Sequence, residues 1–139
     1  MPSHNILIVD DDHFMRTMIR EILTSEGFTV AGEAEDGEEA VKLYRELQPD
    51  LTTMDIVMPK MDGIAALNAI LELDSAAKVI MISSLGQEAL IAEAIETGAK
   101  DFIVKPFQRD RILKVARYVL GLDKGPKEEA KGQWTSPSI

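Results

Sequence analysis

The chain has 139 residues, 45% of them hydrophobic, and a formal net charge of −9, which fits one globular domain with its own core. An acidic chain of this kind lacks the basic stripe that binds nucleic-acid backbones, and its apolar runs are too short to span a bilayer. It has no cysteine, and its first residues do not resemble a signal peptide, so we expect no disulfides and a cytoplasmic location.

The first predicted strand covers residues 6–9, a run too apolar for a half-exposed strand and typical of a buried parallel one. Three consecutive aspartates follow it at residues 10–12. A helix is then predicted up to Gly27, because apolar residues recur there with helical period. They predict an apolar stripe on one helix face, made of Phe14, Met15, Met18, Ile19, Ile22 and Leu23.

Two further strand–helix units are predicted between residues 28 and 71. Strand 28–34 is followed by a helix whose start is marked by Asp36 and Glu39, which have the spacing of a capping box, and which Pro49 ends. Strand 51–54 leads to Asp55 and then to a loop over residues 58–63. The helix after this loop carries Ile64, Leu67, Ile70 and Leu71 on one face.

The last two units complete the predicted domain, which covers residues 1–121. Strand 79–82 closes on Ser83 and Ser84, and strand 102–104 ends at Lys105. The helix between these strands has an apolar side made of Leu90, Ile91, Ala94 and Ile95, and the final helix ends at Gly121. Residues 122–139 contain few large apolar side chains apart from Trp134 and Ile139, so they are predicted to form a disordered tail and not a docking motif.

Five such repeats predict a parallel sheet that is covered by helices on both faces, with right-handed crossovers. Ligands in these folds bind at the carboxyl ends of the strands. Several polar side chains are expected to converge there, namely Asp10, Asp11, Asp55, Ser83 and Lys105. Carboxylates suit a hard cation such as Mg²⁺, and a hydroxyl and an ammonium can hold phosphoryl oxygens. The pattern therefore indicates the transfer of phosphate onto or off a carboxylate.

Each of these residues also has a simpler structural interpretation. Asp10 and Asp11 have the residue type of helix caps, Ser83 that of an N-cap, and Lys105 that of a solvated loop charge. Their joint placement at four strand ends favours the functional interpretation.

Other chemistries fit the sequence poorly. There is no G-x-x-x-x-G-K-[ST] loop, and no G-x-G-x-x-G run follows the first strand. Val57 stands where a phosphatase of the haloacid-dehalogenase kind needs a second acid. His4 and His13 are too few for a catalytic triad or a zinc site, and we expect both at the surface.

Four segments, ILIVDDDHFMR, TMDIVMPKMDG, VIMISS and FIVKPF, resemble the signature segments of response-regulator receivers in order and spacing. The resemblance covers about residues 5–121. Runs such as GAKDFIVKPFQ are most similar to the chemotaxis CheY type of Gram-positive and thermophilic bacteria. The resemblance implies an α/β, flavodoxin-like fold with a doubly wound five-stranded parallel sheet, order 2-1-3-4-5, and five helices, an order known from flavodoxin and CheY.

The resemblance also implies roles for the acidic residues. Asp55 corresponds to the phosphoacceptor, which receives its phosphoryl group from a phosphohistidine of a sensor histidine kinase, here a CheA-like one. Asp10 and Asp11 correspond to the acids that bind Mg²⁺, with Asp55 and the backbone carbonyl of Val57 as further ligands. Asp12 falls just beyond the acidic pair and is left out of the metal set.

Four more residues match positions of the family's switch. Ser83 corresponds to the hydroxyl that follows the phosphoryl group, and Lys105 to the lysine that pairs with it. Pro106 corresponds to the residue that follows this lysine in a cis peptide bond. Phe102 takes the place of the aromatic switch residue, although it is also credible as a plain core residue.

The resemblance finally implies a function through protein binding, by a monomer that contacts neither nucleic acid nor membrane. We expect a phosphorylated form that binds the flagellar motor switch. Val57 and Leu85 occupy two positions that tune hydrolysis in the family, and because both are apolar we expect slow self-dephosphorylation and a separate phosphatase. Two alternatives remain open: a stand-alone receiver in a phosphorelay or other two-component pathway, and a small phosphatase that uses Asp55 as nucleophile, which Val57 weakens.

Overall fold

The computed structural model describes residues 3–123, in which strands and helices alternate along the chain. Most of the predicted tail 122–139, with Trp134 and Ile139, lies outside these residues. The elements are β1 (Asn5–Val9), α1 (His13–Ser25), β2 (Thr29–Ala34), α2 (Gly37–Leu47), β3 (Leu51–Asp55), α3 (Gly63–Leu73), β4 (Val79–Ser84), α4 (Glu88–Thr97), β5 (Asp101–Lys105) and α5 (Arg109–Val119). All strand pairs are parallel, in the order β2-β1-β3-β4-β5, which confirms the predicted fold.

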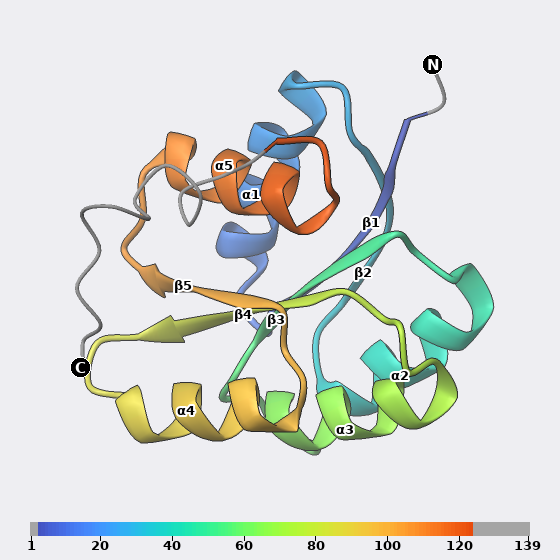
Figure 1. The fold of residues 1–139 in the computed structure, drawn as a ribbon, viewed down its shortest axis with the longest axis vertical. Coiled ribbons are helices and arrows are strands. Elements are labelled where there is room, and N and C mark those ends of the chain that lie inside the picture. The colour runs from blue at the N-terminus through green and yellow to red at the C-terminus, as the bar shows by residue number, and fades with distance from the viewer. Residues whose placement is uncertain (1–2, 124–139) are drawn as a thin grey trace.

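The sheet separates two layers of helices. Helices α1 and α5 cover one face, and α2, α3 and α4 cover the other (Figure 1). Alternate strand residues point to opposite faces: Ile6, Ile8, Ile80 and Ile82 join the core with α1 and α5, whereas Leu7, Val9, Met54 and Met81 join the core with α2 to α4. Residues 6–9 of β1 and 79–82 of β4 are buried on both faces, which explains the continuous apolar runs that identified these strands in the sequence.

Aspartates cap three of the helices. The side-chain Oδ1 atoms of Asp12, Asp36 and Asp62 accept hydrogen bonds from backbone N–H groups in the first turns of α1, α2 and α3, at 3.0, 2.9 and 2.8 Å. The predicted capping box at α2 is only half formed. Glu39 Oε1 accepts from the backbone N–H of Glu35, at 2.9 Å, and not from that of Asp36.

Several sequence predictions about side-chain exposure are wrong. Phe14 is 71% exposed, because it lies off the buried face of α1, which contains Arg16, Ile19 and Leu23. Ile95 is 42% exposed, since α4 is fully buried only at Ala94. His13 is exposed as expected, but His4 is half-buried, with its ring centroid 6.4 Å from that of Phe28.

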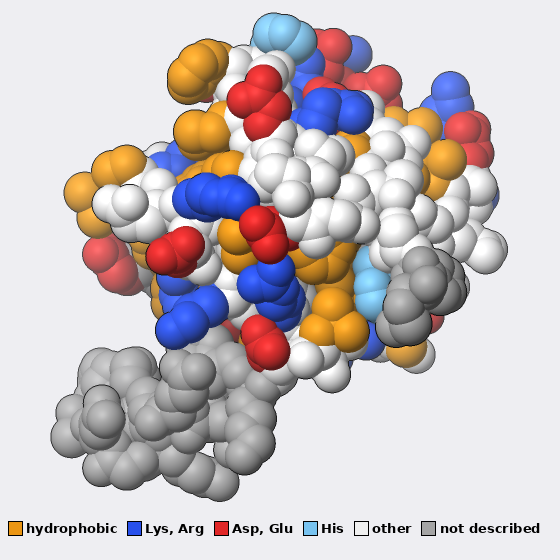
Figure 2. Space-filling view, turned by 90° about the horizontal axis from the view of Figure 1, so that it is seen from above, with side chains coloured by type: hydrophobic (Ala, Val, Ile, Leu, Met, Phe, Trp, Pro, Cys, Tyr) orange, Lys and Arg blue, Asp and Glu red, His pale blue; other side chains and the backbone are white. Residues whose placement is uncertain are grey.

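The face formed by α1 and α5 carries interleaved acidic and basic side chains (Figure 2). Glu26, at the end of α1, binds Arg109 and Arg117 of α5 at 2.8 and 2.9 Å. The hydrogen bonds from Arg109 and Arg117 lower the pKa of Glu26. Ion pairs therefore link the two helices of this layer. Among residues 3–123, no helix combines the length and the apolar character that a membrane crossing requires.

Candidate functional site

Three carboxylates meet at the carboxyl edge of the sheet. Val9 pairs with Met54, so the residues that follow them, Asp10 and Asp55, leave neighbouring strands at the same level. Carboxylate oxygens of Asp10, Asp11 and Asp55 lie within 4.8 Å of one another. The structure thus brings together the three acids that the sequence assigned to a metal. Asp12, left out of that set, caps α1 instead.

Lys105, the last residue of β5, lies beside two of these acids. Its Nζ atom is 3.2 Å from Asp10 Oδ2 and 3.6 Å from Asp55 Oδ2. Burial alone would lower the pKa of Lys105, but the charges of Asp55 and Asp10 outweigh it and raise this pKa. The lysine is therefore held in its ammonium form between the two carboxylates.

The pKa of Asp55 is raised from 3.8 to about 6. Burial is the largest cause, and the charges of Asp10 and Asp11 add to it, while the Lys105 ammonium and a hydrogen bond from the Ile56 backbone act in the opposite direction. The single Lys105 ammonium does not neutralise the three carboxylates, so the site keeps an excess of negative charge. A hard divalent cation with oxygen ligands fits this donor set.

Ser83 follows Ile82, the residue that pairs with Asp55 across the β3–β4 ladder. Ser83 is fully buried, and among the described residues its Oγ atom has no hydrogen-bond partner. Thr52 and Thr53 also have unpartnered hydroxyls, but they lie in the middle of β3. Ser83 differs from them because it stands at the edge where the acids meet. A buried hydroxyl without a partner is uncommon, and an added acceptor at this edge would satisfy it.

The other predicted positions surround this edge. Phe102 pairs with Met81 and is a half-buried residue that packs against the core on the α2–α4 side. The Lys105–Pro106 peptide bond is cis, as predicted. Val57 and Leu85 are 54% and 77% exposed, so neither apolar side chain is part of the core.

Two residues that shape the site, Arg16 and Gly63, were not predicted from the sequence. Arg16 is buried on α1 and its Nη1 atom donates to the Asp10 carbonyl at 2.7 Å. The sequence holds a signal for it, since Arg16 has the helical spacing of the buried face that contains Ile19 and Leu23. Gly63 begins α3, and a Cβ atom on it would lie 2.1 Å from the Asp55 carbonyl oxygen. Only glycine fits so close to the acidic strand end.

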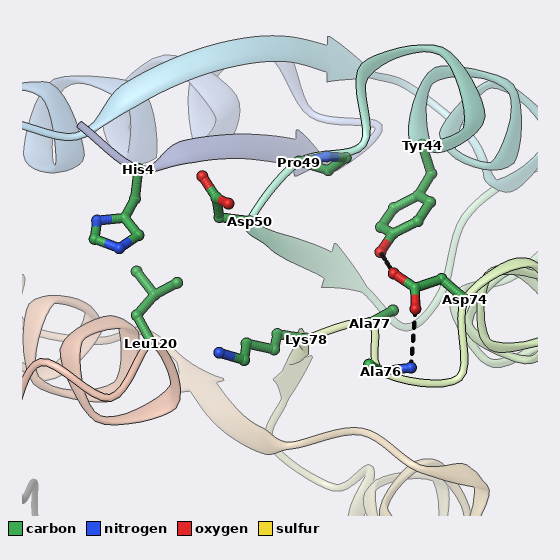
Figure 3. Close-up of a pocket in the computed structure, with 9 residues that line it drawn as sticks. All are labelled: His4, Tyr44, Pro49, Asp50, Asp74, Ala76, Ala77, Lys78 and Leu120. Carbon is green, nitrogen blue, oxygen red and sulfur yellow. Dashed lines mark hydrogen bonds between the residues drawn. The ribbon is translucent and has the colours of Figure 1, made fainter. Parts of the chain in front are cut away.

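A separate hollow of about 300 Å³ lies at the opposite, amino end of the strands (Figure 3). Its lining is mixed, and consists of His4, Tyr44, Pro49, Asp50, Asp74, Ala76, Ala77, Lys78 and Leu120. The Tyr44 hydroxyl donates to Asp74 Oδ2 at 2.9 Å, and Asp74 Oδ1 accepts from the Ala76 N–H at 3.0 Å. Among the described residues, Asp10, Asp11 and Asp55 are the one group of acids and histidines close enough to hold a metal ion, so no comparable cluster lines this hollow.

Comparisons with known proteins agree with this geometry. The family model described as response regulator receiver domain matches residues 6–117. The chain is 55% identical to the chemotaxis protein CheY of Bacillus subtilis over 118 residues, 85% of this chain and 98% of that one. It is 54% identical to CheY of Thermotoga maritima over 114 residues, which is 82% of this chain and 95% of that one.

Among solved structures, a crystal structure described as the CheX–CheY–BeF₃–Mg²⁺ complex from Borrelia burgdorferi matches with a TM-score of 0.80 and 48% identity. The match covers 84% of this chain and 88% of that chain. With the fold, the acidic strand ends and these relatives in agreement, the chain belongs to the response regulator receiver domain family and is of the CheY type.

Proposed function

We propose that this chain is a response regulator in bacterial chemotaxis whose phosphoacceptor is Asp55. The observation that carries this proposal is the convergence of Asp10, Asp11 and Asp55 on one edge of the sheet, with the Lys105 ammonium beside them. In the transfer, an Asp55 carboxylate oxygen attacks the phosphorus of a phosphohistidine on a CheA-like kinase. An oxygen–phosphorus bond forms, the nitrogen–phosphorus bond breaks, and the histidine leaves with that electron pair.

Asp10, Asp11 and Asp55, with the Val57 backbone carbonyl, are proposed to hold Mg²⁺. The bound ion would supply positive charge that offsets the carboxylates and the phosphoryl oxygens. Lys105 already lies 3.6 Å from Asp55 Oδ2, so it can pair with a phosphoryl oxygen once Asp55 is modified. Most of the work of the protein in this reaction is to position charges, as in other phosphoryl transfers.

The phosphoryl group is proposed to switch the protein through Ser83 and Phe102. Phosphorylation adds charge and acceptor oxygens, and the unpartnered Ser83 hydroxyl would donate to one of them. Its movement would vacate space for the Phe102 ring, which would turn from a half-buried to a buried position. The surface of α4, β5 and α5 would then favour a different partner, in a two-state equilibrium that the modification biases.

The output is proposed to be the binding of a flagellar motor switch protein by a cytoplasmic monomer. The CheY relatives favour chemotaxis over a phosphorelay or another two-component pathway, and in this family the receiver is a phosphoacceptor and not an enzyme with an external substrate. The Borrelia relative was crystallised with CheX, and we propose that a partner of that kind removes the phosphoryl group here. With Val57 and Leu85 apolar and exposed, no side-chain amide or acid at these positions orients water, so self-dephosphorylation is slow.

Phosphorylation of the full chain by acetyl phosphate tests the site. In Mg²⁺ buffer, intact-mass measurements should show the addition of one phosphoryl group to the wild type and none to Asp55→Asn. Asp12→Asn is the matched control, because asparagine keeps the cap of α1, and it should be phosphorylated like the wild type. A chelator should suppress the reaction. Equal phosphorylation of Asp55→Asn would contradict the assignment.

Binding to the motor tests the output. A peptide from the flagellar motor switch protein should bind more tightly after beryllofluoride and Mg²⁺ are added, and this tightening should be absent in Asp55→Asn. An affinity that does not respond to beryllofluoride, together with efficient transfer of phosphate to a histidine phosphotransfer domain, would instead favour the phosphorelay. The decay of the acyl phosphate, followed by mass, tests the predicted long lifetime, which rapid loss would contradict.

A further inference from the structure

Arg16 is the only buried basic residue among residues 3–123. It is 8% exposed and shares the inner face of α1 with Ile19 and Leu23. Burying a charge is unfavourable unless hydrogen bonds compensate it. Its presence on this face therefore depends on the groups that its guanidinium binds.

The Arg16 guanidinium binds Glu33 of β2 and points toward Asp10, the residue that follows β1. Its Nε atom donates to Glu33 Oε1 at 3.0 Å, and its Nη1 atom donates to the backbone carbonyl of Asp10 at 2.7 Å. The Nη2 atom lies 3.4 Å from His13 Nδ1. Glu33 is also bound by Arg20, whose Nε donates to Oε2 at 2.6 Å. Burial acts to raise the pKa of Glu33, but the bonds from Arg20 and Arg16 outweigh it and lower this pKa, so Glu33 is a charged anchor.

Asp10 is held at every one of its polar atoms. Its backbone N–H donates to the Ala34 carbonyl at 3.0 Å. Its carboxylate accepts from the Asp12 N–H at 2.9 Å and from Lys105 Nζ at 3.2 Å. The remaining group, the carbonyl, is the one that Arg16 binds. Because the peptide unit is planar, a bond to this carbonyl also sets the orientation of the Asp11 N–H, and so the direction in which the chain leaves toward the Asp11 side chain.

We propose that Arg16 is a positioning residue for the divalent-cation site, an inference that rests on the metal site of the proposed function. Arg16 contacts none of the three carboxylates. It fixes the peptide plane between Asp10 and Asp11, and thereby places their carboxylates opposite Asp55. Without the guanidinium, the Asp10 carbonyl loses its buried donor and the peptide is free to rotate away from the geometry that the cation requires.

Calorimetric titration of the unphosphorylated full chain with Mg²⁺ tests this role. Arg16→Met should weaken Mg²⁺ binding by about 10- to 100-fold, the usual effect of removing a group that orients metal ligands. Arg16→Lys should recover part of the affinity, because an ammonium can reach one of the two acceptors but cannot replace the planar fork. Arg20→Met is the matched control: it removes the other arginine of Glu33 but no contact to Asp10, so Mg²⁺ affinity should stay at the wild-type value.

A second measurement needs no metal. Amide hydrogen exchange at Asp11 and Asp12 should be faster in Arg16→Met than in the wild type and unchanged in Arg20→Met. Where Arg16→Met does not fold, Arg16→Lys carries the test, with circular dichroism as the check of its fold. Wild-type affinity in the Arg16 variants, or equal losses in Arg16→Met and Arg20→Met, would overturn the inference alone. A wild-type chain that does not bind Mg²⁺ would overturn the metal site of the proposed function, and this inference with it.

Discussion

Replacing Asp55 by asparagine should stabilise the unphosphorylated protein in the absence of divalent cations. The pKa of Asp55 is raised from 3.8 to about 6 by burial and by the neighbouring acids, so folding favours its neutral form. A tenfold change in proton affinity corresponds to about 1.4 kcal/mol, and the difference therefore amounts to about 3 kcal/mol. The side chain is 12% exposed and partly screened by solvent, so we expect a gain of about 2 kcal/mol in the free energy of unfolding at neutral pH.

The pH dependence provides the decisive measurement. The pKa of Asp55 is higher in the folded than in the unfolded state. Ionisation of Asp55 therefore does not lower the free energy of unfolding below about pH 4, lowers it increasingly as the pH rises, and has its full effect above about pH 6. Urea unfolding of the wild type and Asp55→Asn should therefore give curves that separate between these values. The matched control Asp12→Asn changes an exposed acid one residue from the cluster and should follow the wild type. A gain that is absent at neutral pH, or equally large at pH 4, would refute the reasoning.

Three further perturbations test neighbouring parts of the site. Ser83→Ala should leave the free energy of unfolding unchanged or raised, because it removes an unpartnered buried hydroxyl, yet calorimetry should show weaker binding of beryllofluoride; a clear loss of stability would contradict this. Lys105→Met should raise the pKa of Asp55 above about 6, measured by carboxyl NMR, since the ammonium lowers it; a fall would contradict the ion pair. Gly63→Ala should destabilise the fold by more than about 3 kcal/mol, because its Cβ would lie 2.1 Å from the Asp55 carbonyl oxygen. Gly27→Ala, which meets open space at φ +91, should cost only about 1–2 kcal/mol, and equal losses in urea unfolding would contradict the steric explanation.

The fold and the composition of the site were readable from local features. Strands of a parallel sheet are buried on both faces, so short runs such as residues 6–9 and 79–82 are continuously apolar and stand out against the amphipathic helices. The polar residue after each run then lies at the carboxyl edge of the sheet. This rule is sufficient to group Asp10, Asp55 and Lys105 before any coordinates are known.

The properties of the site depend on distances through space, which only the tertiary structure supplies. The raised pKa of Asp55 follows from its burial and its approach to Asp10 and Lys105, and neither can be read along the chain. Helical periodicity placed Phe14 in the apolar stripe of α1, but the buried face of this helix is the one with Arg16, Ile19 and Leu23, and the Phe14 side chain is exposed.

The burial of Arg16 also depends on tertiary contacts that cannot be read along the chain. Arg16 was not singled out in the sequence, and its burial depends on Glu33 of β2, 17 residues along the chain, which pairs with its guanidinium. The sequence by itself determined which groups meet at the strand ends, since that outcome needs only the direction of parallel strands. The tertiary structure decided how these groups are held and charged, because hydrogen bonds and desolvation depend on neighbours that are distant in sequence.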